Sequence, residues 1–228
     1  MVRLGVVTGL RREARCLATF PVPLRPETRC AGANAGHARN AALDLLAEGC
    51  DALLSFGIAG GLDPLLGFGT TIVADTVVTQ TGQKFNTTDW WREKLLRTLN
   101  ELPPVRSATI AGSDWPITTE VERLALREAS GAVAVDMESH AVAEVASDAE
   151  VPFLALRVVA DTFTDFVPKW VNDCVSDDGG IKPLVLTTGI IFHPRDIVAL
   201  FRLAQTSRAA LNQLHRALLL AGPQLCAD

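Results

Sequence analysis

The segment formed by residues 51–64, DALLSFGIAGGLDP, joins an apolar run to a group of closely spaced glycines. A continuous apolar run such as residues 51–56 is typical of a strand covered on both faces, so we predict a buried strand that ends at Gly57. The glycines at 57–61 are predicted to form a turn, either a tight strand-to-helix connection or a place where backbone approaches a ligand. Their spacing differs from that of a dinucleotide-binding motif, and the Lys-Ser or Lys-Thr pair of a phosphate loop is missing.

Strands and helices are predicted to alternate on both sides of this segment. The predicted strands are 3–8, 69–78, 108–111, 131–135 and 153–159, and the predicted helices are 11–17, 38–47, 119–129 and 138–146. Short connections between alternating elements indicate an α/β protein with three α/β/α layers around a mixed, mostly parallel, twisted sheet. We expect a single domain of residues 1–228, with an inserted loop around 163–192 and a C-terminal helix over 194–220.

Composition and charge exclude several classes of protein. The chain has 228 residues, of which 48% are apolar and none is tyrosine, so a large core can form and intrinsic disorder is excluded. Its net charge of −5 provides no basic footprint for nucleic acid. No apolar run reaches about 18 residues, so no membrane-spanning helix is expected, and the start of the chain does not resemble a secretory leader. Five cysteines without metal-binding spacing indicate reduced thiols in the cytoplasm, and we expect no metal and no cofactor.

Acidic residues follow three of the predicted strands: Glu13, Glu138 and Asp161. The ends of strands line the ligand crevice of open α/β sheets, so these carboxylates are candidates for one site. Converging acids can protonate a leaving group and hold sugar hydroxyls around a developing oxocarbenium ion. Each acid taken alone can equally be a solvated residue or one that stabilises a helix N-terminus.

Three segments at predicted strand ends also follow the order of a known family: GIAGGLDP at 57–64, VDMES at 135–139 and LRVVAD at 156–161. They resemble the glycine turn, the Met-Glu signature and the catalytic strand of the purine nucleoside phosphorylase and methylthioadenosine/S-adenosylhomocysteine nucleosidase family. GLRREA at 9–14 and the last helix with its preceding loop are similar to the hopanoid-associated phosphorylase subgroup. The resemblance implies a nucleoside phosphorylase-like fold.

The resemblance assigns a role to each matching residue. Asp161 matches the acid that bonds the purine base and protonates it as it departs. Glu138 matches the glutamate that holds the ribose 2′- and 3′-hydroxyls, and Met137 matches the residue that packs on the ribose face. Glu13 matches the residue that activates the attacking water in the nucleosidases. Further substrate-binding residues implied by the resemblance are Gly60, Ile58, Trp115, Ile117 and Phe163. A lone tryptophan such as Trp115 can equally be a core residue.

The chain departs from the family pattern in and beside the catalytic strand. Ala160 replaces the serine that precedes the acid, and Ile58 replaces a serine of the glycine turn. Apolar side chains fill much of the segment 163–170 beyond the acid. They would suit a bulky hydrophobic substituent at the ribose 5′ end, although the packing of an inserted segment explains them as well.

Two nucleophiles fit the end of the first strand. Phosphorolysis needs amide and guanidinium donors for a dianion, and Gly9, Arg11 and Arg12 are the candidates. Hydrolysis needs a carboxylate that takes a proton from water, and Glu13 is the candidate. Arg11 and Arg12 can equally be the solvated start of a helix, so phosphate and water both remain open.

The expected function is cleavage of the N-glycosidic bond of an adenine nucleoside with a 5′ substituent, which the subgroup resemblance identifies as adenosylhopane in hopanoid biosynthesis. Adenine would be released with phosphate or water as co-substrate. Alternatives are a methylthioadenosine/S-adenosylhomocysteine nucleosidase and a non-enzymatic nucleoside-binding or membrane-surface module. The basic, amphipathic helix over 194–220 supports the last alternative, with peripheral contact at the inner face of the membrane, unless it packs on the sheet. We expect a homo-oligomer, most simply a two-fold dimer.

Overall fold

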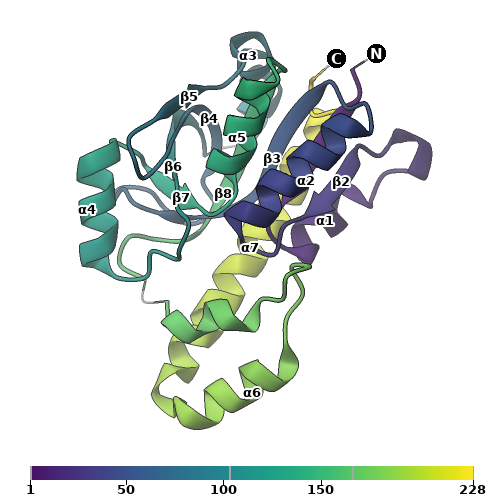
Figure 1. The fold of residues 1–228 in the computed structure, drawn as a ribbon. Helices are drawn as coiled ribbons and strands as arrows, with labels where there is room; N and C mark the ends of the chain where they lie inside the picture. Colours follow the sequence, from purple (N-terminus) through teal and green to yellow (C-terminus); the bar gives the residue numbers. More distant parts are fainter. Residues whose placement is uncertain (1, 103, 166, 228) are drawn as a thin grey trace.

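The computed structural model describes residues 2–102, 104–165 and 167–227 (Figure 1). The strands form one eight-stranded sheet within these residues. They are β1 Leu4–Thr8, β2 Glu27–Cys30, β3 Ala52–Gly61, β4 Thr71–Val78, β5 Lys84–Asn86, β6 Val105–Gly112, β7 Ala134–Asp136 and β8 Phe153–Asp161. The α-helices are α1 Arg11–Leu17, α2 Ala35–Ala47, α3 Asp89–Thr98, α4 Glu120–Ser130, α5 Ser139–Asp148, α6 Pro183–Phe192 and α7 Ile197–Ala221. Short 3₁₀ helices are η1 Val22–Leu24, η2 Leu99–Glu101, η3 Lys169–Cys174 and η4 Pro194–Asp196.

The sheet is mixed and partly closed. Parallel pairs join β1 to β2 and β3, β3 to β8, β4 to β6, and β6 to β7. The pairs β3–β7, β4–β5 and β4–β8 are antiparallel. The path β3–β7–β6–β4–β8 returns to β3, so these strands close a ring from which β2, β1 and β5 extend. The prediction of a mixed, mostly parallel sheet is confirmed.

Helices cover the sheet on two sides, which confirms the predicted layers. α2 and α5 pack on one face through buried side chains such as Leu45 and Val142. α3 and α7 pack on the other face, where Trp91 and Leu214 are buried. The two cores are separated because side chains alternate across each strand, and Figure 1 shows α2 and α5 side by side on the first face.

Two expectations about local structure are wrong. The glycines at 57–61 do not form a turn, because β3 continues through them to Gly61 and pairs with β8 at Gly57 and Gly60. The segment predicted as an inserted loop contains η3 and α6. Residues 183–192 form a short apolar run, and the periodicity of such a run does not distinguish a helix from a strand. For this reason α6 was not expected. The elements β2, β5 and α3 were also not predicted.

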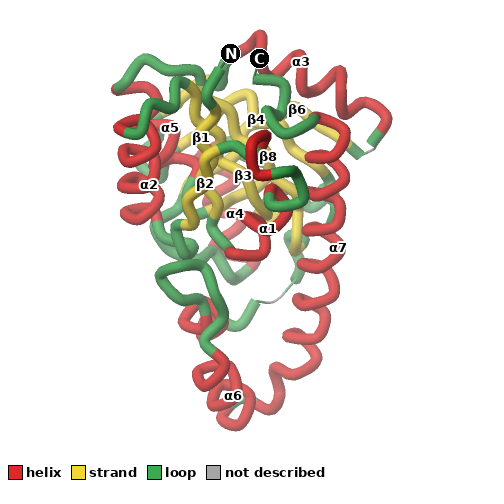
Figure 2. Tube along the Cα trace, turned by 90° about the vertical axis from the view of Figure 1, so that its right-hand side faces the viewer, coloured by secondary structure: helices red, strands yellow, loops and turns green. Residues whose placement is uncertain are grey.

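The last helix has two different halves. Ala210, Leu214, Ala217 and Leu218 of α7 are buried against the sheet, whereas no residue from 181 to 209 is buried. Figure 2 shows α6 and the first part of α7 projecting away from the sheet.

Candidate functional site

The first component of the site is a carboxylate fixed at the start of α1. Glu13 lies in the first turn of this helix and is buried. Its Oε2 accepts the amides of Gly9 at 2.9 Å and Leu10 at 2.8 Å, and its Oε1 accepts the amide of Ile58 at 2.8 Å. Three donors from two segments of backbone therefore hold the carboxylate in one orientation.

The second component is the turn between β7 and α5. Asp136 Oδ1 accepts the amides of Glu138 at 2.8 Å and Ser139 at 2.7 Å, which positions the start of α5. Asp136 Oδ2 accepts the Nε–H of Arg157 at 2.9 Å. The turn thereby presents the buried carboxylate of Glu138, whose Oε2 lies 3.3 Å from Nη2 of Arg157.

The third component is a fully buried arginine in the middle of β8. Arg157 Nη2 donates to Ser55 Oγ at 2.6 Å and to Ser139 Oγ at 3.0 Å. Its Nη1 is buried and has no hydrogen-bond partner among the described residues. A buried guanidinium must be paired to be tolerated, and here the neighbouring carboxylates supply the countercharge.

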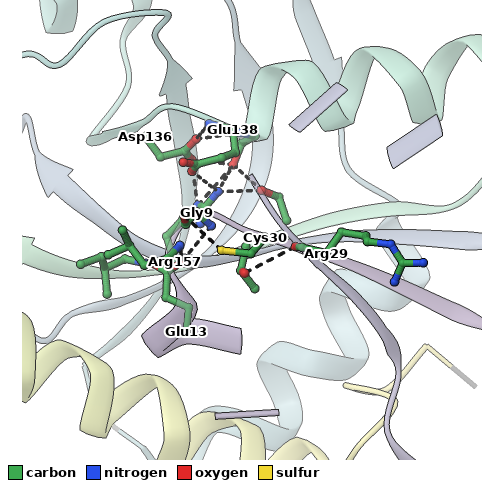
Figure 3. Close-up of polar contacts among 12 residues, drawn as sticks. Gly9, Glu13, Arg29, Cys30, Asp136, Glu138 and Arg157 are labelled. Atoms are coloured by element: carbon green, nitrogen blue, oxygen red, sulfur yellow. Dashed lines mark hydrogen bonds and ion pairs between the residues drawn. The ribbon is translucent and has the colours of Figure 1, made fainter. Parts of the chain in front are cut away.

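Two glycines create the space in which these side chains meet. A methyl group at Gly57 would lie 2.6 Å from Glu13 Oε1 and would also collide with Arg157 Nη1. A methyl group at Gly9 would lie 2.5 Å from Glu138 Oε1. Figure 3 shows these side chains converging beside Gly9. Elements far apart in the sequence thus form one polar cluster of Glu13, Asp136, Glu138 and Arg157.

The cluster holds three acids and one guanidinium, so its charge is unbalanced when every acid is ionised. Burial raises the pKa of Glu138 to about 8, against the attraction of Arg157 and with the support of Asp136 and Glu13. Burial also raises the pKa of Glu13, in spite of Arg157 and the three amide donors. The pKa of Asp136 is lowered, because Arg157 and Ser139 outweigh its burial. The two glutamates therefore bind a proton more readily than Asp136 does.

The fourth component, Asp161, ends β8 over Gly60. A methyl group at Gly60 would lie 3.2 Å from Asp161 Oδ2. Arg123 of α4 is buried, forms an ion pair with this oxygen, and donates to the carbonyls of Gly61 at 3.0 Å and Thr162 at 2.6 Å. Burial raises the pKa of Asp161, and Arg123 opposes the rise. The acid is therefore fixed in a largely dry position by a guanidinium that the sequence did not suggest.

Strand pairing brings this acid and the polar cluster to the same part of the sheet. Gly60 of β3 pairs with Asp161 of β8 on one side and with Val135 of β7 on the other. The turn that carries Glu138 follows Val135 directly. The three predicted acids thus lie at neighbouring strand ends.

The structure does not bring Arg11 and Arg12 to the cluster. Arg11 forms an ion pair with Asp178 near the surface, and Arg12 is exposed without a hydrogen bond to the cluster in the described part of the chain. Both begin α1, as the alternative of a solvated helix start predicts.

The other predicted substrate-binding residues differ in exposure. Trp115 is 58% exposed. Ile117 packs against the small core that includes Val135. Ile58, Met137 and Phe163 are half-buried.

Sequence reasoning assigned no role to Arg157 and Asp136, although both lie in segments that it singled out, and it did not point to Arg123. A signal existed for Arg157, because one charged residue inside the apolar strand 153–159 must find a buried partner. Asp136 stands two residues before Glu138, where an acid can accept helix N-terminal amides. Arg123 has no such signal, because it lies in a helix that mixes charged and apolar residues and leaves apolar Val121 and Leu124 exposed.

A cavity of about 320 Å³ lies beside Asp161. Thr164 and Val167 line one side, and Val198 and Arg202 of α7 line the other. Among the described residues, no group of three or more His, Cys, Asp or Glu side chains is arranged to hold a metal ion.

Comparisons with known proteins agree with this geometry. No curated protein sequence matches the chain, but the family model of the phosphorylase superfamily matches residues 27–176, more than half of it. Native futalosine hydrolase of Helicobacter pylori is similar, with 20% identity, a TM-score of 0.63 and coverage of 71% of this chain and 88% of that chain. The 5′-methylthioadenosine/S-adenosylhomocysteine nucleosidase from Neisseria meningitidis, solved with methylthio-immucillin-A, has 16% identity, a TM-score of 0.70 and coverage of 94% and 95%. The corresponding nucleosidase from Campylobacter jejuni has 16% identity, a TM-score of 0.65 and coverage of 95% and 100%.

Because the sequence identities are 20% or lower, the similar structures establish only the fold, and the match to the family model establishes the family. Together with the acids at neighbouring strand ends, they show that this chain belongs to the phosphorylase superfamily, whose enzymes cleave N-glycosidic bonds.

Proposed function

We propose that this enzyme hydrolyses the N-glycosidic bond of a 5′-substituted adenine nucleoside, with water as the nucleophile. The observation that carries the proposal is the placement of Glu13. Its carboxylate is buried, is oriented by three amides, and has a pKa that burial raises. A carboxylate that is fixed in place and whose pKa is raised is a stronger base, and is therefore suited to take a proton from an attacking water.

The same placement disfavours phosphate as the nucleophile. The amides of Gly9 and Leu10, which would be donors for a dianion at the start of α1, already donate to Glu13. Arg11 and Arg12 lie at the surface, and the buried guanidinium of Arg157 is surrounded by carboxylates. A phosphate dianion here would meet the carboxylates of the cluster, and the donor Arg157 Nη1, unpaired among the described residues, is buried beside Glu13 at Gly57.

Each acid takes one task in the proposed reaction. Water attacks the anomeric carbon while the bond to the base breaks, and Glu13 accepts a proton from that water. Asp161, whose pKa burial raises, donates a proton to N7 of the departing adenine. Glu138 accepts hydrogen bonds from the ribose hydroxyls, and half-buried Met137 packs beside the sugar. Adenine and a free 5-substituted ribose leave, and solvent returns the proton from Glu13 to Asp161.

For the 5′ substituent we propose a bulky hydrophobic group, as in adenosylhopane of hopanoid biosynthesis. Val167, Val198 and Leu203 support this by supplying apolar surface to the cavity beside Asp161, which the charged side chains of Arg195 and Arg202 also line. Methylthioadenosine or S-adenosylhomocysteine is the second candidate, which the similarity to a nucleosidase solved with methylthio-immucillin-A favours. A panel of 5′-substituted adenosines distinguishes them by relative kcat/KM.

We further propose a two-fold dimer located in the cytoplasm. The five cysteines, none of which forms a disulfide, are consistent with a reducing compartment. Light scattering on the purified protein measures the oligomeric state directly.

The nucleophile is tested by measuring adenine release with and without phosphate. We expect a rate that does not depend on phosphate, with free ribosyl product. Glu13→Gln removes the base and should lower kcat by about 10²–10⁴-fold, whereas Arg12→Gln should leave kcat unchanged. A rate that requires phosphate, or an equal loss in Arg12→Gln, would contradict the proposal.

A further inference from the structure

Residues 181–209, which we call the arm, are the part of the chain that the compact body leaves uncovered. No residue of the arm is buried, and Figure 2 shows α6 at its far end, away from the sheet. α6 packs mainly on η3 and η4, where Trp170 lies across Gly189. Among the described residues, exposed side chains such as Leu184, Ile191 and Phe192 make up much of the remaining surface of α6.

The composition of α6 is apolar on all sides. α6 has the sequence PLVLTTGIIF and contains no charged residue. Leu184 is 80% exposed, Ile191 70% and Phe192 78%. A helix that is apolar all round is normally surrounded by apolar material, either protein core or lipid.

The polar side chains of α6 are already satisfied within the helix. Thr187 Oγ1 donates to the carbonyl of Pro183, and Thr188 Oγ1 donates to that of Leu184 at 2.9 Å. Such bonds back to the preceding turn let threonine sit in an apolar medium without an unpaired hydroxyl. Transfer of α6 from water into lipid would therefore leave no side-chain donor unsatisfied.

The length of α6 by itself fits the boundary of a bilayer and not its full thickness. Ten residues of helix are about 15 Å long, about half of a hydrocarbon core. The chain then bends by 103° into the next helical segment, and no single helix of the described residues is long and apolar enough to cross a membrane.

Cations border the apolar surface. Lys182 precedes α6, Arg195 and Arg202 follow it, and all three are exposed. The nearby acid Asp196 accepts a hydrogen bond from Trp170. Anionic lipid headgroups complement the three cations.

We propose that the arm is a docking surface for an anionic lipid bilayer, with α6 and the first turns of α7 placed at the boundary between headgroups and acyl chains. The second half of α7, from Ala210 onward, packs on the sheet. The docking surface is therefore smaller than the whole amphipathic helix over 194–220 that the sequence suggested. The cavity beside Asp161 shares Arg195, Val198 and Arg202 with the arm. Docking would therefore place that cavity next to the membrane. The importance of this position rests on the proposed function, in which Asp161 acts on the substrate.

Vesicle flotation tests the docking surface with the full chain. Vesicles of phosphatidylcholine alone are compared with vesicles of equal parts phosphatidylcholine and phosphatidylglycerol. We expect binding to the anionic vesicles that is at least about 10²-fold weaker in Ile191→Glu/Phe192→Glu and about tenfold or more weaker in Lys182→Gln/Arg202→Gln. The matched control is Val22→Glu/Leu24→Glu, which changes two other exposed apolar residues and should bind like the wild type.

Thermal unfolding and adenine release from the panel of 5′-substituted adenosines are measured for the wild type and for each variant. Unchanged melting shows that lost flotation is not lost folding, and absent adenine release in every variant would contradict the proposed function without touching the docking result. The docking proposal is overturned if the wild type floats with neither kind of vesicle, or if the control loses binding as fully as Ile191→Glu/Phe192→Glu. It is also overturned if those arm substitutions only dissociate a dimer in light scattering.

Discussion

At the scale of single residues, the polar cluster depends on side chains that are absent as much as on those present. Gly57 and Gly9 are needed for space, since neither has a positive φ and both lie against carboxylates. The sequence pointed to Glu13, Glu138 and Asp161 through the segments around them. From the sequence, the glycines were predicted to form a turn. Their actual role could not be predicted, because the side chains that lie against Gly57 belong to residues 44 positions before it and 100 positions after it.

Gly57→Ala is expected to impair catalysis more than folding. The added methyl group must displace Glu13 or Arg157, and a shift of about 1 Å in a catalytic group can cost about 10²-fold in rate. Adenine release and melting temperature measure the two effects separately. Gly67→Ala is the matched control, because a methyl group there has open space. Full activity in Gly57→Ala would show that the cluster is not arranged as described.

Glu138 makes stability depend on pH. Its pKa is raised from 4.5 to about 8 in the folded protein, so between these values the folded state holds a proton that the unfolded state has released. The free energy of unfolding should therefore fall as pH rises through this window. In Glu138→Gln that decline should be shallower, whereas Glu128→Gln, at an exposed position, should follow the wild type. Chemical unfolding at a series of pH values checks this, and identical slopes in all three proteins would refute it.

At the scale of elements, α4 shows how one helix carries two arginines with different tasks. Arg123 is buried and holds Asp161 together with two carbonyls, whereas Arg127, one turn later, is partly exposed and lies 3.4 Å from Asp63. The helix itself was predictable from its composition and the threonine before it. The direction in which each arginine points depends on how α4 packs against the end of β8.

Arg123→Met should destabilise the protein by about 3–5 kcal/mol, because it leaves a buried carboxylate unpaired. Arg127→Met should cost less than about 1 kcal/mol, as for other exposed pairs. Urea unfolding measures both. Loss of the guanidinium also removes the influence that lowers the pKa of Asp161, so its pKa should rise further and the pH optimum of adenine release should move upward in a correctly folded fraction. Equal destabilisation by the two substitutions would argue against the role of Arg123.

The two helices of the C-terminal region, α6 and α7, differ in how far the sequence predicted them. The periodic apolar positions of α7 correctly predicted a helix, but only Ala210 and the buried residues after it use that periodicity to pack on the sheet. In α6 there is no periodicity to interpret, and the helix was therefore not predicted.

At the scale of the whole molecule, the body and the arm follow different rules. The body buries its apolar residues in two cores on opposite faces of a partly closed sheet. The arm leaves large apolar side chains such as Phe192 and Phe201 exposed. The apolar residues of the chain thus lie in two kinds of place: many are buried in the cores, and others are exposed on the surface, several of them on the arm.

The sequence by itself determined the layered α/β architecture, the family and the three acids, because these depend on local periodicity and on short motifs at strand ends. Only the tertiary structure decided that β3 continues through its glycines, that Arg157 and Arg123 hold the acids, and that Arg11 and Arg12 lie outside the cluster. The physical reason is that a buried charge is defined by its partners. Those partners come from distant segments, which only the pairing of β3, β7 and β8 brings together.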